Sequence, residues 1–89
     1  IRLRWLGKDI GFEKIVLKQN RLVGHFLSNQ DSSYYESEQF THILDYVKNM
    51  KGKCYMRENN NKLTITLLNI NGVEEAIRIL QPLLFSKSN

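Results

Sequence analysis

The chain has 89 residues, of which 42 % are hydrophobic and 25 % are charged, and its formal net charge is +4. This size and composition indicate one small globular domain over residues 1–89, and argue against a disordered segment. The mildly basic charge is compatible with nucleic acid, but the sequence lacks the dense Lys and Arg clustering that would argue for it. No apolar run reaches the ~20 residues of a membrane span, and no signal-peptide pattern opens the sequence, so we expect no membrane partner.

The sequence begins in a helical rhythm. Leu3, Leu6 and Ile10 recur at helical spacing, and Gly11 follows as a C-terminal cap. The rhythm is already established at the first residue and no initiator Met precedes it. We therefore expect a fragment of a larger protein, in which the N-terminal part of this first helix is missing.

Two pairs of extended segments follow the same plan. Residues 13–19 and 21–28 are rich in β-branched and aromatic side chains, and Asn20 between them accepts positive φ at low cost, which predicts a β-hairpin. Residues 53–59 and 62–68 form the second predicted pair, joined across Asn59, Asn60 and Asn61. In its last strand the apolar Leu63, Ile65 and Leu67 alternate with polar residues, as in a half-buried strand.

Each predicted hairpin is followed by a helix. The first has an apolar stripe at i, i+3, i+4 and i+7, formed by Phe40, Ile43, Leu44 and Val47, and Gly52 closes it. The last helix has a similar stripe, formed by Val73, Ala76, Ile77 and Leu80.

The ends of the last helix are also predicted from the sequence. Asn71 is its candidate N-cap, with Glu74 three residues further on for a capping box, and Pro82 should end or kink it.

The order α-ββα-ββα predicts an α+β two-layer sandwich, with a four-stranded, mainly antiparallel sheet and the helices on one face. Alternation along the strands assigns one set of side chains to the helix-covered face: Ile15, Leu17, Cys54, Met56, Leu63, Ile65 and Leu67. The opposite face receives the other set: Lys14, Val16, Lys18, Tyr55, Arg57, Thr64 and Thr66.

This outer face has three interpretations. Lysines beside an aromatic ring on an open sheet are typical of platforms that stack single-stranded RNA. Such platforms usually carry at least two aromatics, however, and here Tyr55 stands alone unless His25 or Phe26 joins it through the register of the second strand. An ordinary solvent-exposed face is the favoured interpretation. A surface covered by a partner protein ranks second, ahead of a nucleic-acid platform.

Other chemistry finds little support in the sequence. Cys54 is the only cysteine, which rules out a disulfide within the chain and fits the cytoplasm. A buried structural role is favoured for it over a reactive thiol. His25 and His42 have no Cys or carboxylate at metal-ligand spacing, and the glycines form no phosphate-binding loop. We therefore expect no catalytic residue, metal site or cofactor in this segment.

Residues 28–40, SNQDSSYYESEQF, form the least regular stretch. Ser33 and Glu36 have capping-box spacing, and Ser37 stands directly before the helical rhythm, so we expect a tight turn followed by a helix from about Ser37. At least one of Tyr34 and Tyr35 should lie against the sheet edge. A loop that binds a ligand or is modified at its hydroxyls is the less favoured alternative.

The line GFEKIVLKQNRLVGHFLSNQDSSYYESEQFTHILDYV, preceded by LRWLGKDI, resembles the C-terminal domain of bacterial transcription-repair coupling factor. The similar features are a helix leading into the first strand, a basic hairpin, and a loop into a helix of the "F--IL-yv" kind. In Bacteroides-like versions the loop residues are similar to Asn29, Ser32, Ser33, Tyr34 and Tyr35. The resemblance covers nearly the whole chain, although residues from Lys53 onward are more generic.

The resemblance implies a non-catalytic regulatory domain in an ATP-dependent DNA translocase. Such a parent removes RNA polymerase stalled at a lesion and recruits the excision-repair protein UvrA. The ATP of the parent is bound by its motor domains. The C-terminal domain packs on the module homologous to UvrB, which holds recruitment and translocation in check. Its contacts with UvrA, RNA polymerase and DNA would then be indirect, through the parent.

The family's upstream acidic segment with a D-R-[FY]-G signature does not occur in this sequence, so no contact residue is transferred from the family. From the residues themselves we expect contacts to neighbouring domains, or to nucleic acid in the alternative function, at a small set: Lys14, Lys18, Tyr34, Tyr35, Tyr55 and Arg57.

Overall fold

The structure is a computed structural model that describes residues 2–27, 32–50, 52–60 and 62–85. Asn29 and Asn61, which the sequence placed in connecting loops, and the side chain of Ser32 lie outside the described part. The elements follow in the order α1 (Arg2–Ile10), β1 (Phe12–Lys18), β2 (Arg21–Phe26), α2 (Ser32–Tyr35), α3 (Glu38–Asn49), β3 (Cys54–Asn59), β4 (Lys62–Leu68), α4 (Val73–Leu80) and the 3-10 turn η1 (Gln81–Leu83).

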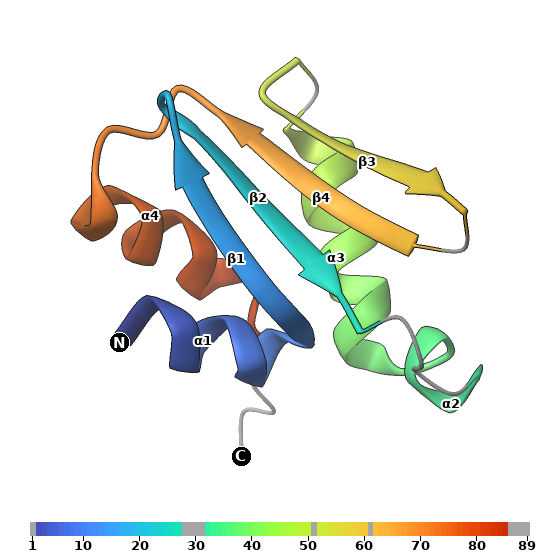
Figure 1. Cartoon of the computed structure of the whole chain (residues 1–89). Coiled ribbons are helices and arrows are strands. Elements are labelled where there is room, and N and C mark those ends of the chain that lie inside the picture. The colour runs from blue at the N-terminus through green and yellow to red at the C-terminus, as the bar shows by residue number, and fades with distance from the viewer. Residues whose placement is uncertain (1, 28–31, 51, 61, 86–89) are drawn as a thin grey trace.

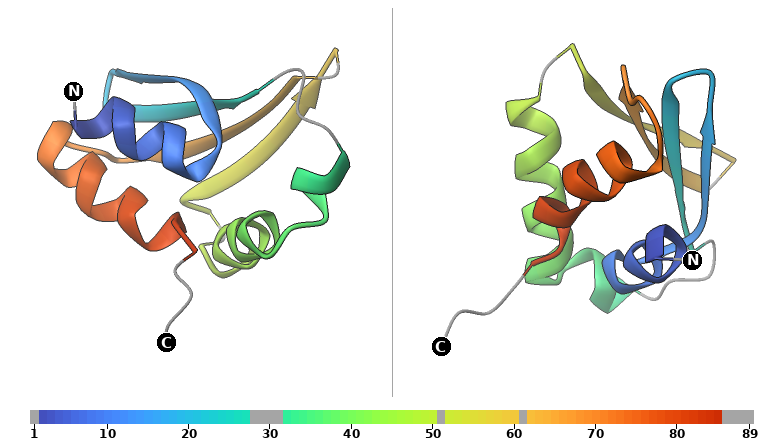
Figure 2. Two further views of the ribbon diagram at one scale, coloured as in Figure 1. Left: turned by 90° about the horizontal axis from the view of Figure 1, so that it is seen from below. Right: turned by 90° about the vertical axis from the view of Figure 1, so that its left-hand side faces the viewer.

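The four strands form one antiparallel sheet in the order β1-β2-β4-β3 (Figure 1). The helices lie along one side of this sheet and leave its other side uncovered (Figure 2). The predicted α+β sandwich with helices on one face is therefore confirmed. The short helix α2, one turn before α3, is an addition to the predicted order. Among the described residues, no helix combines the length and apolar character that a membrane crossing requires.

A two-residue turn sets the register of the first hairpin. Gln19 and Asn20 have φ values of 54° and 60°, so both occupy the left-handed region that a type I′ turn requires. Lys18 therefore pairs with Arg21, and the pairing continues to Lys14 opposite His25. A register shift between Phe12 and Lys14 turns the start of β1 back toward the core.

The helix-covered face of the sheet carries the core. The seven predicted inward side chains all belong to the buried cluster or pack against it, as expected from their alternation. Helices α1, α3 and α4 contribute to the same core. The buried cluster consists of Ile10, Phe12, Leu22, Phe26, Phe40, Ile43, Cys54, Ile65, Leu67, Ile70, Ala76, Leu80 and Leu83.

Three details of the predicted helices are wrong. Val73, assigned to the apolar stripe of α4, is 51 % exposed in the first turn of that helix. Leu44, assigned to the apolar stripe of α3, is 43 % exposed, because α3 contacts β3 and η1 along a narrower strip than a fully covered helix would. Asn71 does not cap α4: the N-cap is Gly72, and the backbone N–H of Asn71 donates to the Glu75 carboxylate at 2.6 Å. The predicted start of α3 is confirmed, since the Ser37 hydroxyl accepts from the Phe40 N–H at 3.2 Å.

The side chain of Tyr34, from α2, contacts the junction between α1 and β1. Gly11 ends α1 at φ 125°, and a Cβ built on it would lie 2.3 Å from the Tyr34 hydroxyl oxygen. That hydroxyl donates to the carbonyl of Ile10 at 2.8 Å. A glycine is required here both for its backbone conformation and for the space that the tyrosine occupies.

We expect Gly11→Ala to lower the free energy of unfolding by about 2–4 kcal/mol, since backbone strain and overpacking add. Gly72→Ala is the matched control, because Gly72 also has positive φ (96°) but nothing lies within 4 Å of its added Cβ. Urea unfolding of both variants measures the difference. If both variants lose the same free energy of unfolding, the close contact between position 11 and Tyr34 adds nothing to the cost of the substitution.

Candidate binding surface

The uncovered side of the sheet presents three rows of side chains that run across the strands. The pairing places Val16, Val23, Thr66 and Tyr55 in one row. A second row consists of Lys14, His25, Thr64 and Arg57, and a third of Lys18, Arg21 and Leu68. Lys62 lies on the same side at the start of β4, opposite Asn59. We call these twelve positions and Asn59 the basic face.

The seven predicted outward residues all lie on the basic face, so that part of the interpretation is confirmed. The register also settles an alternative: His25 joins the face, whereas Phe26 points into the core with 2 % exposure. Arg21 and Lys62 were missed. Arg21 lies on this side opposite Lys18 in the pairing of β1 with β2, and Lys62 lies there opposite Asn59 in the pairing of β3 with β4.

Charge on the basic face has a single sign. Lys14, Lys18, Arg21, Arg57 and Lys62 are exposed, and no Asp or Glu stands in any of its rows. No described carboxylate lies within 4.0 Å of these cations, since the ion pair in the described part joins Arg78 to Glu75 on α4. The positive charges therefore remain available to an outside anion.

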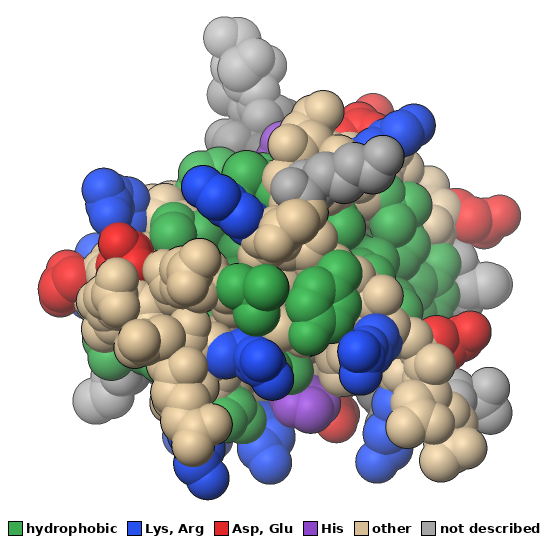
Figure 3. Space-filling view, turned by 90° about the horizontal axis from the view of Figure 1, so that it is seen from above, with side chains coloured by type: hydrophobic (Ala, Val, Ile, Leu, Met, Phe, Trp, Pro, Cys, Tyr) green, Lys and Arg blue, Asp and Glu red, His purple; other side chains and the backbone are tan. Residues whose placement is uncertain are grey.

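The middle of the basic face is apolar. Figure 3 shows hydrophobic side chains on this side, with Lys, Arg and His side chains around them. Val16 and Val23 are half-buried there, and Thr66 is only 6 % exposed between its neighbours Val23 and Tyr55. The Arg57 guanidinium carbon lies 5.3 Å from the centre of the Tyr55 ring, within the range of a cation–π contact.

The two adjacent tyrosines occupy different environments. Tyr34 is half-buried, and burial together with the neighbouring Tyr35 raises its pKa to about 12. Its ring lies 6.2 Å from that of Phe26 and 5.6 Å from that of Phe40. Tyr35 packs edge-on against Phe40 at 5.1 Å and is 37 % exposed. The predicted aromatic anchor is therefore Tyr34, and neither ring lies in the rows of the basic face.

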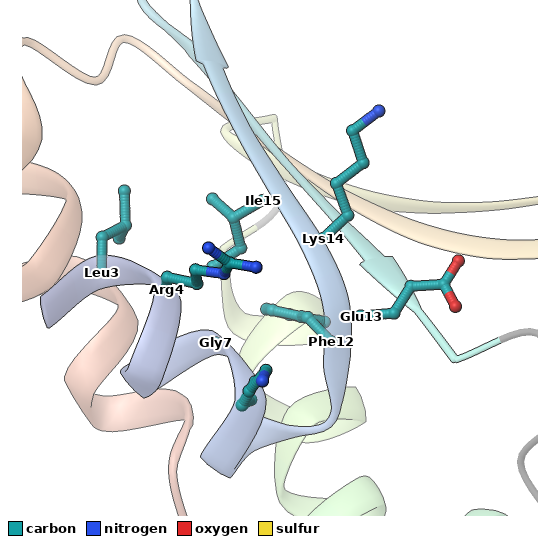
Figure 4. Close-up of a pocket in the computed structure, with 8 residues that line it drawn as sticks. Leu3, Arg4, Gly7, Phe12, Glu13, Lys14 and Ile15 are labelled. Atoms are coloured by element: carbon teal, nitrogen blue, oxygen red, sulfur yellow. The ribbon is translucent and has the colours of Figure 1, made fainter. Parts of the chain in front are cut away.

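A groove lies between α1 and β1, beside the basic face (Figure 4). Its volume is about 330 Å³, and it is lined by Leu3, Arg4, Gly7, Lys8, Phe12, Glu13, Lys14 and Ile15. Phe12 and Ile15 point toward α1, whereas Glu13 and Lys14 leave β1 on the other side. Gly7 keeps the helix close to the strand, because a Cβ there would lie 2.3 Å from Ile15 Cδ1.

No converging set of reactive groups occurs in the described residues. They contain no cluster of three His, Cys, Asp or Glu side chains that could hold a metal ion. Cys54 is 4 % exposed, and burial raises the pKa of its thiol to about 11. The basic face can therefore bind through charge, hydroxyl groups and one aromatic ring, and offers no nucleophile in an activated state.

No protein-family model, curated protein sequence or solved structure matches the chain. The assignment of a role therefore depends on the surface chemistry and on the resemblance described from the sequence.

We expect Tyr34→Phe to lower the free energy of unfolding by about 1–2 kcal/mol at pH 8, because the Ile10 carbonyl loses its donor. The pKa of Tyr34 is raised by folding from 10 to about 12, so its contribution is complete below pH 10 and falls as the pH rises toward 12. The difference between the wild type and Tyr34→Phe, measured by urea unfolding, should shrink over that range. A difference independent of pH would contradict the raised pKa.

Cys54 should react slowly with iodoacetamide in the folded chain at pH 8, because a pKa of about 11 leaves roughly one thiol in a thousand ionised. The same chain in urea should react at the rate of an ordinary free cysteine. Mass spectrometry over time measures both rates. Similar rates in the two conditions would contradict the buried position of the thiol.

Proposed function

We propose that this chain is a non-catalytic regulatory domain, the C-terminal domain of a transcription-repair coupling factor. In this proposal it docks on the UvrB-homology module of its parent protein, and in the docked arrangement it restrains both UvrA recruitment and ATP-driven translocation. Engagement of RNA polymerase favours the undocked arrangement. Such a switch requires only two packed arrangements and a ligand that prefers one of them.

The observation that supports this proposal is the packing of the residues that carry the resemblance. The stretches GFEK and SSYYESEQF are far apart in the sequence, yet Tyr34 reaches Ile10 and Gly11 at the end of α1. The same tyrosine packs with Phe26 and Phe40. The residues that carry the resemblance therefore pack together where α1, the first hairpin and α3 meet.

Tyr35 is the side chain of this segment that we assign to the docked interface. Its ring is held against Phe40 at 5.1 Å, so little conformational freedom would be lost on contact. Its exposed part offers an amphipathic surface of the kind enriched in interfaces.

A second candidate function is nucleic-acid binding. The observation that favours it is the basic face itself, with exposed cations in two of its three rows and at Lys62, and no acidic residue in those rows. The two functions concern different surfaces and can be tested separately.

In a full-length coupling factor that contains this chain, deletion of residues 1–89 should increase UvrA pull-down and basal ATP hydrolysis by about 5-fold or more, the usual size of a coupling between sites. Tyr35→Ala should increase both in the same direction. Val73→Ala is the matched control, because Val73 is 51 % exposed on α4, at the opposite end of the molecule from α2 (Figure 1).

Unchanged values for both measurements in the deletion would defeat the proposal. An equal response to Tyr35→Ala and Val73→Ala would retain the regulatory role and remove Tyr35 from the interface. Helicase motifs directly upstream in the gene would support the family assignment before any protein is made, and a different flanking domain would overturn it.

A further inference from the structure

We propose that the basic face binds single-stranded nucleic acid, with phosphates on its Lys and Arg side chains and a base stacked at Tyr55. This proposal rests on the second candidate function and deepens it, by naming the class of nucleic acid and the residues that bind it. It does not rest on the regulatory role, which concerns Tyr35 on α2.

The first argument is the concentration of charge. Five exposed cations stand on one side of the sheet, while Glu36, Glu38 and Asp45 lie together around a pocket on the α3 side. The formal net charge of the whole chain is only +4, so the residues other than these five cations carry no net positive charge. Glu13 leaves β1 on the same side as Lys14, but the five cations outnumber it. A surface with such an excess of positive charge attracts a polyanion and not a neutral ligand.

The second argument is the spacing of those cations. Neighbouring strands lie about 4.8 Å apart, so the row from Lys14 on β1 to Arg57 on β3 spans about 14 Å. Lys18 on β1 and Arg21 on β2 stand two rows further along, beyond the row of Val16 and Val23, at the end where the hairpin turns. The cations therefore border the face on several sides, and an extended chain of phosphates can contact them while its bases lie over the centre.

The third argument is the chemistry of the centre. Tyr55 stands beside the half-buried Val16 and Val23, and the Arg57 guanidinium lies 5.3 Å from its ring centre. Bases stack both on aromatic rings and on arginine planes, so the pair offers a place for one base. An acidic protein segment would pair with the cations, but its carboxylates would make no stacking or apolar contact with Tyr55, Val16 and Val23. A duplex would satisfy them but would keep its bases stacked inside.

Binding is tested with the 89-residue chain and a labelled oligothymidylate or oligouridylate of about 8–16 nucleotides, by fluorescence anisotropy at low salt. We expect saturable binding at concentrations up to about tens of micromolar, as for non-specific nucleic-acid binding. With three or four phosphate contacts, log K should fall against log salt with a slope of about −2 to −3. A duplex of the same length should bind less tightly.

Tyr55→Leu separates stacking from charge. Leucine keeps an apolar side chain over Thr66 but has no ring, so affinity should fall by about 5-fold or more while the salt slope stays the same. Tyr55→Phe is the matched control and should bind like the wild type. Circular dichroism and thermal unfolding verify that both variants are folded.

Charge variants locate the phosphates. Lys14→Gln and Lys18→Gln should each weaken binding and reduce the magnitude of the salt slope by about 0.7. Glu13→Gln should strengthen binding, because Glu13 leaves β1 on the same side as Lys14. Lys48→Gln removes an exposed cation from α3, away from the face, and should change nothing.

Absence of binding to both oligonucleotides at low salt would overturn the proposal. So would equal affinity for the duplex, or equal loss in Lys14→Gln and Lys48→Gln. If polyglutamate binds as tightly as oligothymidylate and Tyr55→Leu has no effect, the face is a surface for acidic protein and the nucleic-acid proposal is wrong.

Discussion

The structure depends on the one-sided character of its sheet. Burying an apolar face is the main source of stability for a chain of this size, and alternation along a strand allows only one such face unless the strand is apolar throughout. Leu22, Ile65 and Leu67 point to the helices and are almost completely shielded from water. The opposite side is then free to carry charge. The basic face is therefore polar because the apolar side chains of the same strands are buried on the opposite, helix-covered face.

Much of the fold could be predicted because its signals are local. Alternation assigned the sides of β1, β3 and β4 correctly, and Ser37 marked the start of α3. The errors at Leu44 and Val73 came from tertiary contacts. Whether Leu44 is buried depends on how wide a strip of α3 is covered, and no spacing rule contains that information. At the start of α4 the error is local, because the N-cap is Gly72, whose φ of 96° favours glycine, one residue after the predicted Asn71.

The candidate site could be predicted only in part, for a related reason. Strand pairs that follow each other in the sequence are readable from their turns, but the central pairing joins β2 to β4, across α2, α3 and β3. That pairing brings Arg21 beside Leu68 and His25 beside Thr64. Alternation therefore placed Lys14, Lys18, Arg57 and Tyr55 on one side of the sheet, whereas only the pairing of the strands added Arg21, His25 and Lys62 to that side.

The two outermost strands differ in how their free backbone edges are protected. A helix, α1, packs along β1, and the irregularity after Phe12 further interrupts that margin. Helix α3 contacts β3 less extensively than α1 contacts β1, and β3 is six residues long and ends in Arg57, Glu58 and Asn59. Brevity and charge discourage strand-to-strand addition between copies. Substitutions that make the end of β3 apolar would therefore endanger solubility long before they disturbed the fold.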